Sequence, residues 1–499
     1  MSTRRVSITV FLTAAVVASA VAAAEPDFGA RLALVEEARL SEAFAAVAVK
    51  AERPVPWPTF ANLRYRELKG DGKVRDGDLA PGRDAAIWLA VLDDEYRTTA
   101  RLIFVEGGKV PGVPADRWIS LGEYEDEVMP ALMRAPGALE DEKVKEEASK
   151  LVARATALQE LSWRELRLIP GPAEEGWKTL GPERPGWEHA VALNQAYGDG
   201  DAAAMHEAAA RLATTLAAQA GYPPAAKLKL EVYLRKFGVL KIGFFLYLLS
   251  SLSFFVWAAL GRKWLANAGA WVAFAGFVFI TAGLAGRSIV AGYLPTTGMY
   301  EYLALFSWAS VLIFLLFYLK TRQAFLGTIV MPVAFLLIVL ASLFPSKIEG
   351  QLIPALQSWW LTIHVTLACL GEGAFAVGFA AAVLYLFRGD KPSRYLPSKE
   401  ALDVLEYRAI AIGFPLFTIG GLVAGAIWAQ KAWSVWWSWD PKETASLVVF
   451  LIAVAYLHAR RLAGWRGRRT AILAALIFVA SVLTLFANLI FGGLHAYGV

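Results

Sequence analysis

Two long apolar runs are joined by the segment Trp433-Ser434-Val435-Trp436-Trp437-Ser438-Trp439-Asp440-Pro441-Lys442-Glu443, whose first seven residues include four tryptophans. Membrane-spanning helices are usually joined by short polar loops, so this density of indoles needs a reason. One reason is an aromatic belt, because indoles favour the membrane–water boundary. The other is a binding surface, because grouped indoles offer flat apolar area and N–H donors to a large planar ligand with a polar edge.

The composition of the whole chain places this segment in a membrane protein. Of its 499 residues, 57% are hydrophobic and 19% are charged, which is typical of a chain that crosses a bilayer. The net charge of +5 does not indicate a nucleic acid partner, because the Lys and Arg residues cluster at the ends of apolar runs. The single cysteine, Cys369, excludes a disulfide framework and a thiolate metal cluster.

The N-terminal part of the chain has the features of an exported domain. Residues 1–24 combine two early arginines, an apolar stretch and a small-residue ending, which indicates a signal peptide, with an uncleaved anchor as the alternative. Residues 25–235 are more polar and include two segments with helical patterns. We therefore expect an exported, mainly helical soluble domain there, and we find no catalytic signature in it.

Residues 236–499 contain eight apolar runs long enough to cross a bilayer, each of which needs ~20 residues. The chain is therefore predicted to be an all-α polytopic membrane protein with about eight transmembrane helices after the exported domain. We place the spans at 237–260, 268–286, 301–319, 324–344, 360–387, 409–429, 444–459 and 471–494.

Basic residues set the orientation of these spans. Lys and Arg follow the first, third, fifth and seventh spans, and the positive-inside rule then places these loops in the cytoplasm. The clearest cluster follows span seven: Arg460, Arg461, Arg466, Arg468 and Arg469. The tryptophan segment and the C-terminus are then external, which agrees with an exported domain that enters span one from outside. Four basic residues between 227 and 236 oppose this orientation locally.

Three histidines lie in the membrane part, and two of them are expected near the tryptophan segment. His364 lies about one turn inside span five, and His495 follows span eight on the same side. A lone intramembrane histidine is often a helix–helix hydrogen bond. A pair beside grouped indoles favours function, because ionisable groups at membrane depth are costly and imidazole is a common axial ligand of haem iron. His458, near the cytoplasmic end of span seven, is too far away to share that iron and predicts a second site.

A known signature resembles these segments. Trp433 to Thr444 resembles the tryptophan-rich WWD signature of haem-handling proteins of cytochrome c biogenesis, and its ending from Trp439 is similar to the CcsA type of system II. Ser434 stands where that family usually has glycine, which concerns the geometry of the loop. The likeness runs from about residue 280 to 499. It includes three histidine-bearing segments, Leu352–Val365, Tyr456–Arg460 and Asn488–Tyr497.

This resemblance implies a function in cytochrome c biogenesis. As one subunit of a system II cytochrome c synthase, or haem lyase, the chain would export haem b and present it externally for thioether attachment to a Cys-x-x-Cys-His segment of apocytochrome c. The implied haem ligands are His364, His495 and His458. The implied attachment site consists of Trp433, Trp436, Trp437, Trp439 and Asp440.

The resemblance also implies partners and a location. The partners are a CcsB-type membrane subunit that supplies a further histidine, the apocytochrome c, and a thiol reductant system, without nucleic acid. The location is the bacterial inner (cytoplasmic) membrane, with the N-terminal domain and the WWD-like loop on the periplasmic side.

Two other functions remain open from the residues. One is a transporter of haem or another solute without ligation activity, although such proteins favour internal repeats and we find none. The other is a structural scaffold of an assembly complex, which would not need three histidines at two depths.

The roles of two charged residues are also open. Lys442 would pair a haem propionate or only snorkel to the interface. Glu372, in Gly371-Glu372-Gly373, would relay protons, bind a cation or hydrogen-bond a neighbouring span.

Overall fold

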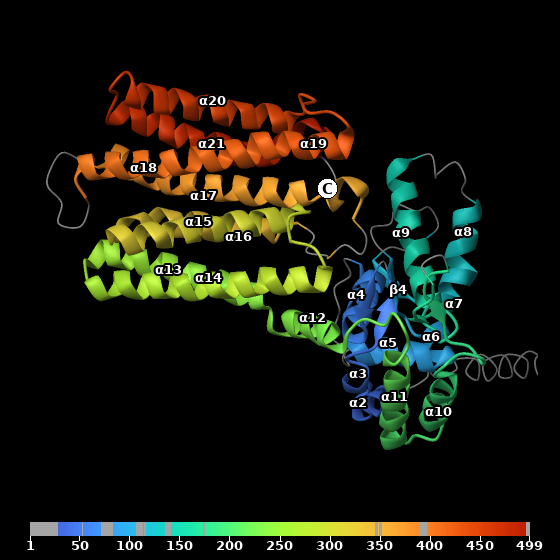
Figure 1. The fold of residues 1–499 in the computed structure, drawn as a ribbon. Helices are drawn as coiled ribbons and strands as arrows, with labels where there is room; N and C mark the ends of the chain where they lie inside the picture. The colour runs from blue at the N-terminus through green and yellow to red at the C-terminus, as the bar shows by residue number, and fades with distance from the viewer. Residues whose placement is uncertain are drawn as a thin grey trace, which may run out of the picture. The chain divides into compact units, whose positions relative to one another are not determined.

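The computed structural model describes residues 28–51, 53–70, 83–105, 113, 116–134, 141–172, 175–344, 348, 352–388 and 397–495. The expected signal peptide, residues 1–24, lies outside them. The chain divides into two compact units, Met1–Val232 and Tyr233–Val499, which are considered one at a time (Figure 1).

The first unit is mainly helical. Its helices are α2 (Gly29–Glu37), α3 (Leu40–Ala43), α4 (Trp57–Lys69), α5 (Arg83–Leu92), α6 (Asp94–Thr99), α7 (Leu121–Glu123), the π-helix η1 (Tyr124–Val128), α8 (Met129–Arg134), α9 (Glu142–Gln159), α10 (Trp187–Gly198), α11 (Ala202–Ala217) and α12 (Ala225–Phe237), the last of which continues into the second unit. Among the residues that the structure describes, three antiparallel pairs of strands accompany them: β1 (Ala48–Lys50) with β2 (Pro54–Pro56), β3 (Ile103–Val105) with β4 (Arg117–Ile119), and β5 (Arg167–Ile169) with β6 (Lys178–Thr179).

An aromatic cluster forms the centre of this unit. The Trp57 and Trp88 rings lie 4.1 Å apart, and Phe44 meets Trp88 edge-on at 4.8 Å. All three side chains are buried, so α4 and α5 are fixed by large apolar surfaces that leave water together.

The second unit is a bundle of long apolar helices. They are α13 (Val239–Leu260), α14 (Lys263–Ala291), α15 (Met299–Thr321), the 3₁₀-helix η3 (Ala324–Leu326), α16 (Gly327–Ala341), the 3₁₀-helix η4 (Pro354–Gln357), α17 (Trp359–Phe387), α18 (Lys399–Phe417), the π-helix η5 (Thr418–Ala424), α19 (Gly425–Trp433), α20 (Pro441–Arg461) and α21 (Arg468–Phe491). Within the described residues they provide eight helical segments long and apolar enough to cross a membrane. The prediction of an all-α polytopic membrane protein is confirmed.

Helix α17 lies at the centre of this bundle. It packs against α15, α18 and α21, while α13 and α14 lie on one side of the bundle and α20 and α21 on the opposite side (Figure 1). The segment from Gly371 to Gly378 is buried throughout. Small residues allow α17 to lie close to α15. A Cβ added to Gly373 of α17 would lie 2.7 Å from the carbonyl carbon of Ala309 on α15.

Several span boundaries differ from the predicted ones, and the structure gives a physical reason for two of the differences. The sixth span begins at Lys399, before the predicted residue 409, because the charge of Asp403 is compensated. Its carboxylate pairs with Arg460 of α20, with Oδ1 2.6 Å from Nη1, so an acidic residue is tolerated in the packed helix. The eighth helix ends at Phe491 and not at residue 494, because Gly492 and Gly493 take positive φ angles of 71° and 119° and turn the chain.

The close approach of α15 and α17 gives a test of the fold. We expect Gly373→Ala to destabilise the protein by about 1–3 kcal/mol, because the new methyl group meets backbone atoms that cannot move away. Gly421→Ala is the matched control, because its Cβ would meet only the Phe417 ring at 3.5 Å, an ordinary contact. Thermal unfolding of the full-length protein in detergent measures both. Equal midpoints for the two variants would contradict tight packing of α15 on α17.

Candidate functional site

The tryptophan loop, residues Trp433–Asp440, connects α19 to α20. Helix α19 ends where Ser434 takes a left-handed conformation, with a φ of 61°, and its N–H donates to the Gln430 carbonyl at 3.1 Å. Trp439 is also left-handed, with a φ of 58°. Such angles cost energy in residues other than glycine, so side-chain contacts must hold the loop in this shape.

Glu443 supplies part of that support from the first turn of α20. Its Oε2 accepts hydrogen bonds from the backbone N–H of Ser438 at 2.8 Å and of Asp440 at 3.2 Å, and from the Ser438 hydroxyl at 3.0 Å. Asp440 and Glu443 together form a capping box, with Pro441 as the first residue of the helix. The start of α20 and the end of the loop are therefore fixed by the same groups.

Asp440 also holds the C-terminal segment. Its Oδ2 accepts from the Asn488 amide at 3.0 Å and the Leu494 N–H at 2.6 Å, and its Oδ1 lies 2.9 Å from Nδ1 of His495. Burial alone would raise the pKa of Asp440, but the hydrogen bonds from His495 and Asn488 outweigh it and hold this pKa well below its usual range. The carboxylate is thus ionised and can only accept, so Nδ1 of His495 carries the proton and Nε2 keeps its lone pair.

The second histidine is oriented by a carbonyl group. Nδ1 of His364, on α17, lies 2.8 Å from the carbonyl oxygen of Gly420 in the π-helix η5. Because a carbonyl only accepts, Nδ1 is again the protonated nitrogen and Nε2 carries the lone pair. Both imidazoles therefore have the tautomer that can donate an Nε2 lone pair to a metal, with Nδ1 held by the protein.

Trp428 joins the two histidines, and the sequence analysis did not include it in the site. Its ring is stacked on His364, with centroids 5.8 Å apart and planes 8° apart, and it lies 5.3 Å from the His495 ring. Trp433 contacts Trp428 and His495, each at 4.8 Å. The Trp428 indole is buried and donates to the Ala355 carbonyl at 2.8 Å. Its place just before the tryptophan segment was the only signal in the sequence.

A cavity opens beside this aromatic cluster. Its volume, counted as the space open to the centres of water molecules, is about 130 Å³, and it is partly open to solvent. Its walls include both histidines, Trp428 and Trp437, and further in Glu372 of α17 and Lys442 of α20. A large ligand in this cavity would meet two imidazoles, aromatic faces and charged groups.

The four predicted tryptophans separate into two pairs. Trp433 contacts His495 and Trp437 lines the cavity, and both are half-buried. Trp436 and Trp439 are instead 59% and 69% exposed. The structure therefore brings Trp433, Trp437 and Asp440 together with the histidine pair, and it leaves Trp436 and Trp439 on the outer surface of the loop.

His495 lies outside the helical spans and is mostly buried. Burial lowers its pKa, the Lys442 ammonium adds to that effect, and Asp440 opposes it. Because the lowering prevails, the imidazole is neutral at pH 7, as a metal ligand must be. Span eight was predicted to run to residue 494, just before His495. Helix α21 instead ends at Phe491, and His495 lies on a turn after the two glycines.

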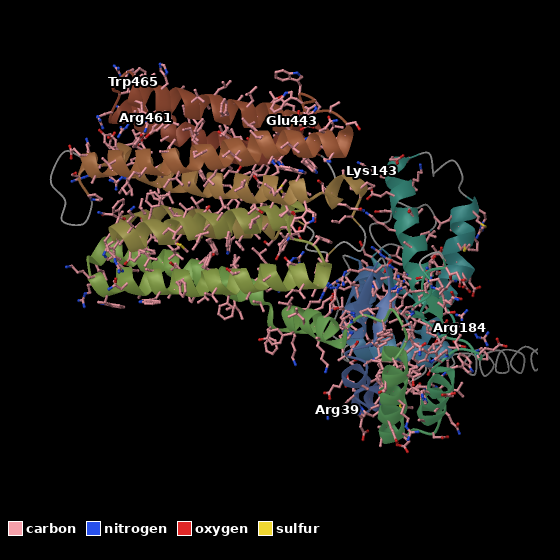
Figure 2. All side chains as sticks on the ribbon, in the orientation of Figure 1. Arg39, Lys143, Arg184, Glu443, Arg461 and Trp465 are labelled. Carbon is pink, nitrogen blue, oxygen red and sulfur yellow. The ribbon has the colours of Figure 1, made fainter. Side chains whose placement is uncertain are left out.

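His458 lies at the opposite end of α20 from the tryptophan loop; Glu443 and Arg461 mark these two ends in Figure 2. Its side chain is exposed. Two residues earlier, on the buried side of α20, the Tyr456 hydroxyl donates to the buried Glu406 at 2.9 Å. His458 is therefore separated from the histidine pair, as the sequence analysis expected from its place in span seven.

Glu372 hydrogen-bonds a neighbouring span. The Tyr302 hydroxyl, from α15, donates to its Oε2 at 2.7 Å. The Lys442 ammonium lies over the same Tyr302 ring, 5.2 Å from its centroid. Of the possibilities open for Glu372, the structure thus contains the bond between spans, and it also places this carboxyl group in the cavity wall.

Comparison with known proteins identifies the family. A family model described as "Cytochrome C assembly protein" matches residues 296–495. The "Cytochrome c biogenesis protein CcsA" of Trieres chinensis is 36% identical over an alignment of 301 residues that covers 52% of this chain and 95% of the relative. The CcsA protein of Guillardia theta is 38% identical over an alignment of 250 residues that covers 44% of this chain and 82% of the relative.

A solved structure is similar as well. The protein titled "Cytochrome c Heme Lyase CcmF" has a TM-score of 0.42 and 19% sequence identity, over 50% of this chain and 46% of its own. The match to the Trieres chinensis protein is much closer in sequence and covers nearly all of that relative. The chain therefore belongs to the CcsA family of cytochrome c biogenesis proteins.

Proposed function

We propose that this chain binds haem b in the cavity beside the tryptophan loop and presents it for covalent attachment to apocytochrome c. One observation carries the proposal: two histidines from separate segments lie against the same buried indole, each with Nδ1 held by a protein acceptor. Two imidazoles suit an iron whose other four ligands come from a porphyrin.

The donor set fits haem better than a bare metal ion. Structural zinc sites use four protein ligands and catalytic ones three, and no group of three or more His, Cys, Asp or Glu side chains suited to a metal occurs among the described residues. The ring of Trp428 and the half-buried Trp433 and Trp437 offer the apolar faces that a porphyrin needs. Asp440 and the Gly420 carbonyl fix the imidazoles, as outer partners of metal ligands usually do.

The chain would act in attachment mainly by positioning. Addition of a thiol S–H across a haem vinyl C=C bond releases no leaving group, so the protein needs no nucleophile of its own. Bound haem supplies the vinyl groups and the iron, and the residues supply orientation and exclusion of water. The exposed rings of Trp436 and Trp439 form the rim at which an apocytochrome Cys-x-x-Cys-His segment would arrive.

The same proposal includes the orientation of the chain and its partners. The positive-inside pattern supports an orientation with the tryptophan loop on the external side, which for a bacterial inner membrane protein would be the periplasm. As a subunit of a system II cytochrome c synthase, it would work with a CcsB-type subunit and a thiol reductant system. His458, exposed at the other end of α20, would receive haem together with a histidine of that subunit.

Export without attachment is the second candidate function. It is favoured by the presence of histidines at both ends of α20, since a carrier of haem also needs an entry and an exit site. The two functions differ in product, because only attachment yields a thioether-linked cytochrome. A membrane scaffold, the third possibility from the sequence, would have no use for two oriented imidazoles.

The first prediction concerns the axial ligands. Protein purified from cells should show a low-spin haem spectrum, and His364→Ala or His495→Ala should deplete the haem or change that spectrum by opening one position on the iron. Added imidazole should partly restore the spectrum. His189→Ala is the control, because His189 belongs to the first unit and is not among the residues that line the cavity. An unaltered spectrum in the double variant would remove these two residues from the proposal.

The second prediction separates the two pairs of tryptophans. Trp437→Ala should weaken haem retention about two- to tenfold, as expected for loss of a stacking contact of ~0.5–1.5 kcal/mol, and Trp437→Phe should be mild. Trp436→Ala should retain haem and lower the yield of attached cytochrome, because the ring is on the exposed rim. Haem content and cytochrome yield measure the two effects. Equal haem loss in both Ala variants would contradict the division.

The third prediction concerns His458. His458→Ala should lower the haem content of protein from cells, while the purified variant reloaded with haem should regain the wild-type spectrum, because His364 and His495 are intact. The effect of His458→Ala should be larger when the CcsB-type subunit is coexpressed.

The orientation of the chain is tested by labelling. Arg466→Cys, at a side chain that is 71% exposed, should react with a thiol reagent only from the cytoplasmic side. Labelling from outside would invert the orientation and remove the entry site at His458.

A further inference from the structure

Lys442 occupies an unfavourable position for a cation. It is the second residue of α20, where the positive end of the helix dipole repels an ammonium group. It also lies in a membrane-spanning segment, where a charge is costly and tends to have a partner or a function. Its presence in the cavity wall therefore needs a compensating interaction.

The surrounding protein supplies only part of that interaction. The ammonium lies over the face of Tyr302 at 5.2 Å, a cation–π contact. The Tyr302 ring is held in place because its hydroxyl donates to Glu372 at 2.7 Å. Among the described residues, the Lys442 ammonium makes no hydrogen bond and no ion pair within 4.0 Å of a carboxylate oxygen.

The two acidic residues next to Lys442 along the chain, Asp440 and Glu443, are already engaged. Oε2 of Glu443 accepts the hydrogen bonds of the tryptophan loop. Both oxygens of Asp440 accept hydrogen bonds, from the backbone of Lys442 itself, from Asn488 and Leu494, and from the His495 ring. These donors fix the carboxylate on the C-terminal segment. Lys442 thus has Glu372 and Asp440 as electrostatic neighbours, but in the described part of the chain it forms an ion pair with neither, and it lies in the cavity wall.

We propose that Lys442 binds a carboxylate of the ligand in this cavity, so that the propionate edge of haem faces Tyr302 and the vinyl edge faces Trp436 and Trp439. The inference rests on the proposed function and deepens it. A charge-assisted bond between ammonium and carboxylate is the contact that the cavity otherwise lacks. Glu372 acts through Tyr302 as a positioning residue, because it holds the ring on which the ammonium rests.

The arrangement explains which edge of the ligand would meet the thiols. The ionisable groups Lys442 and Glu372 belong to the cavity wall, whereas Trp436 and Trp439 are exposed at the surface of the loop. Haem has the same asymmetry, with two carboxylates on one edge and two vinyl groups on the opposite side of the ring. Lys442 would therefore select the orientation that is competent for thioether formation.

The test compares haem with haem dimethyl ester, in which both propionates are neutral. Full-length protein in detergent, freed of haem, is titrated with each compound and the Soret band is followed. Wild type should bind haem at least about tenfold more tightly than the ester, as expected for a charged hydrogen bond. Lys442→Met should bind the two compounds with equal affinity, and Lys442→Arg should keep the preference.

Lys431→Met is the matched control, because Lys431 is an exposed lysine in the last turn of α19, next to the same loop. It should leave the preference for haem unchanged. The low-spin spectrum should persist in Lys442→Met, because both imidazoles remain. If Lys442→Met does not fold, Lys442→Gln takes its place. The preference of wild type for haem over the ester should then persist in Lys442→Arg and be lost in Lys442→Gln.

The outcomes separate this inference from the proposed function. If neither compound gives a low-spin spectrum with wild type, the haem site itself is wrong. If both give that spectrum with equal affinity, haem binding stands and the role of Lys442 is overturned. A phospholipid phosphate bound to the Lys442 ammonium would also give equal affinities for haem and its dimethyl ester. In that case, added anionic lipid would raise the thermal unfolding midpoint of wild type but not that of Lys442→Met.

Discussion

The carboxylate of Asp440 is the group on which the geometry of the site depends. It begins α20 as the helix cap, and it holds Asn488, Leu494 and His495 of the C-terminal segment. Without an ionised acceptor at this point, the turn that carries His495 would lose its attachment to the start of α20. A buried carboxylate with several donors is stable, so one side chain fixes a helix, a loop and an imidazole.

The tryptophan loop has a local energetic cost that the helix cap offsets. Ser434 and Trp439 both have left-handed backbones, which cost of order 1–3 kcal/mol each. The three hydrogen bonds that Glu443 accepts compensate part of that cost and make the loop rigid. The result is that Trp433 and Trp437 stay beside the cavity while Trp436 and Trp439 stay exposed. A loop with this division of its indoles differs from a simple aromatic belt, in which every ring would face the interface.

The lengths of the apolar runs were enough to predict eight spans, and the positions of the histidines along them were enough to separate His458 from His364 and His495. The remaining features depend on tertiary contacts that a single sequence does not reveal. The start of the sixth span at Lys399 depends on the pair between Asp403 and Arg460. The orientation of His364 depends on η5, whose wider turn has no strong signal in a Gly- and Ala-rich apolar segment. Trp428 was visible as one more tryptophan, but only packing places its ring against both histidines.

The length of α20 limits how the two ends of the bundle can cooperate. Its rise of 1.5 Å per residue separates Asp440 from His458 by about 27 Å, so no single haem can contact both. The cavity includes His364 and, two turns further along α17, Glu372, a depth of about 12 Å. Tyr456 and Glu406, near His458, do not line it in the described part of the chain. Transfer of a ligand between the two ends would therefore require movement of the packed helices or a path along the outer surface of the bundle, where His458 is exposed.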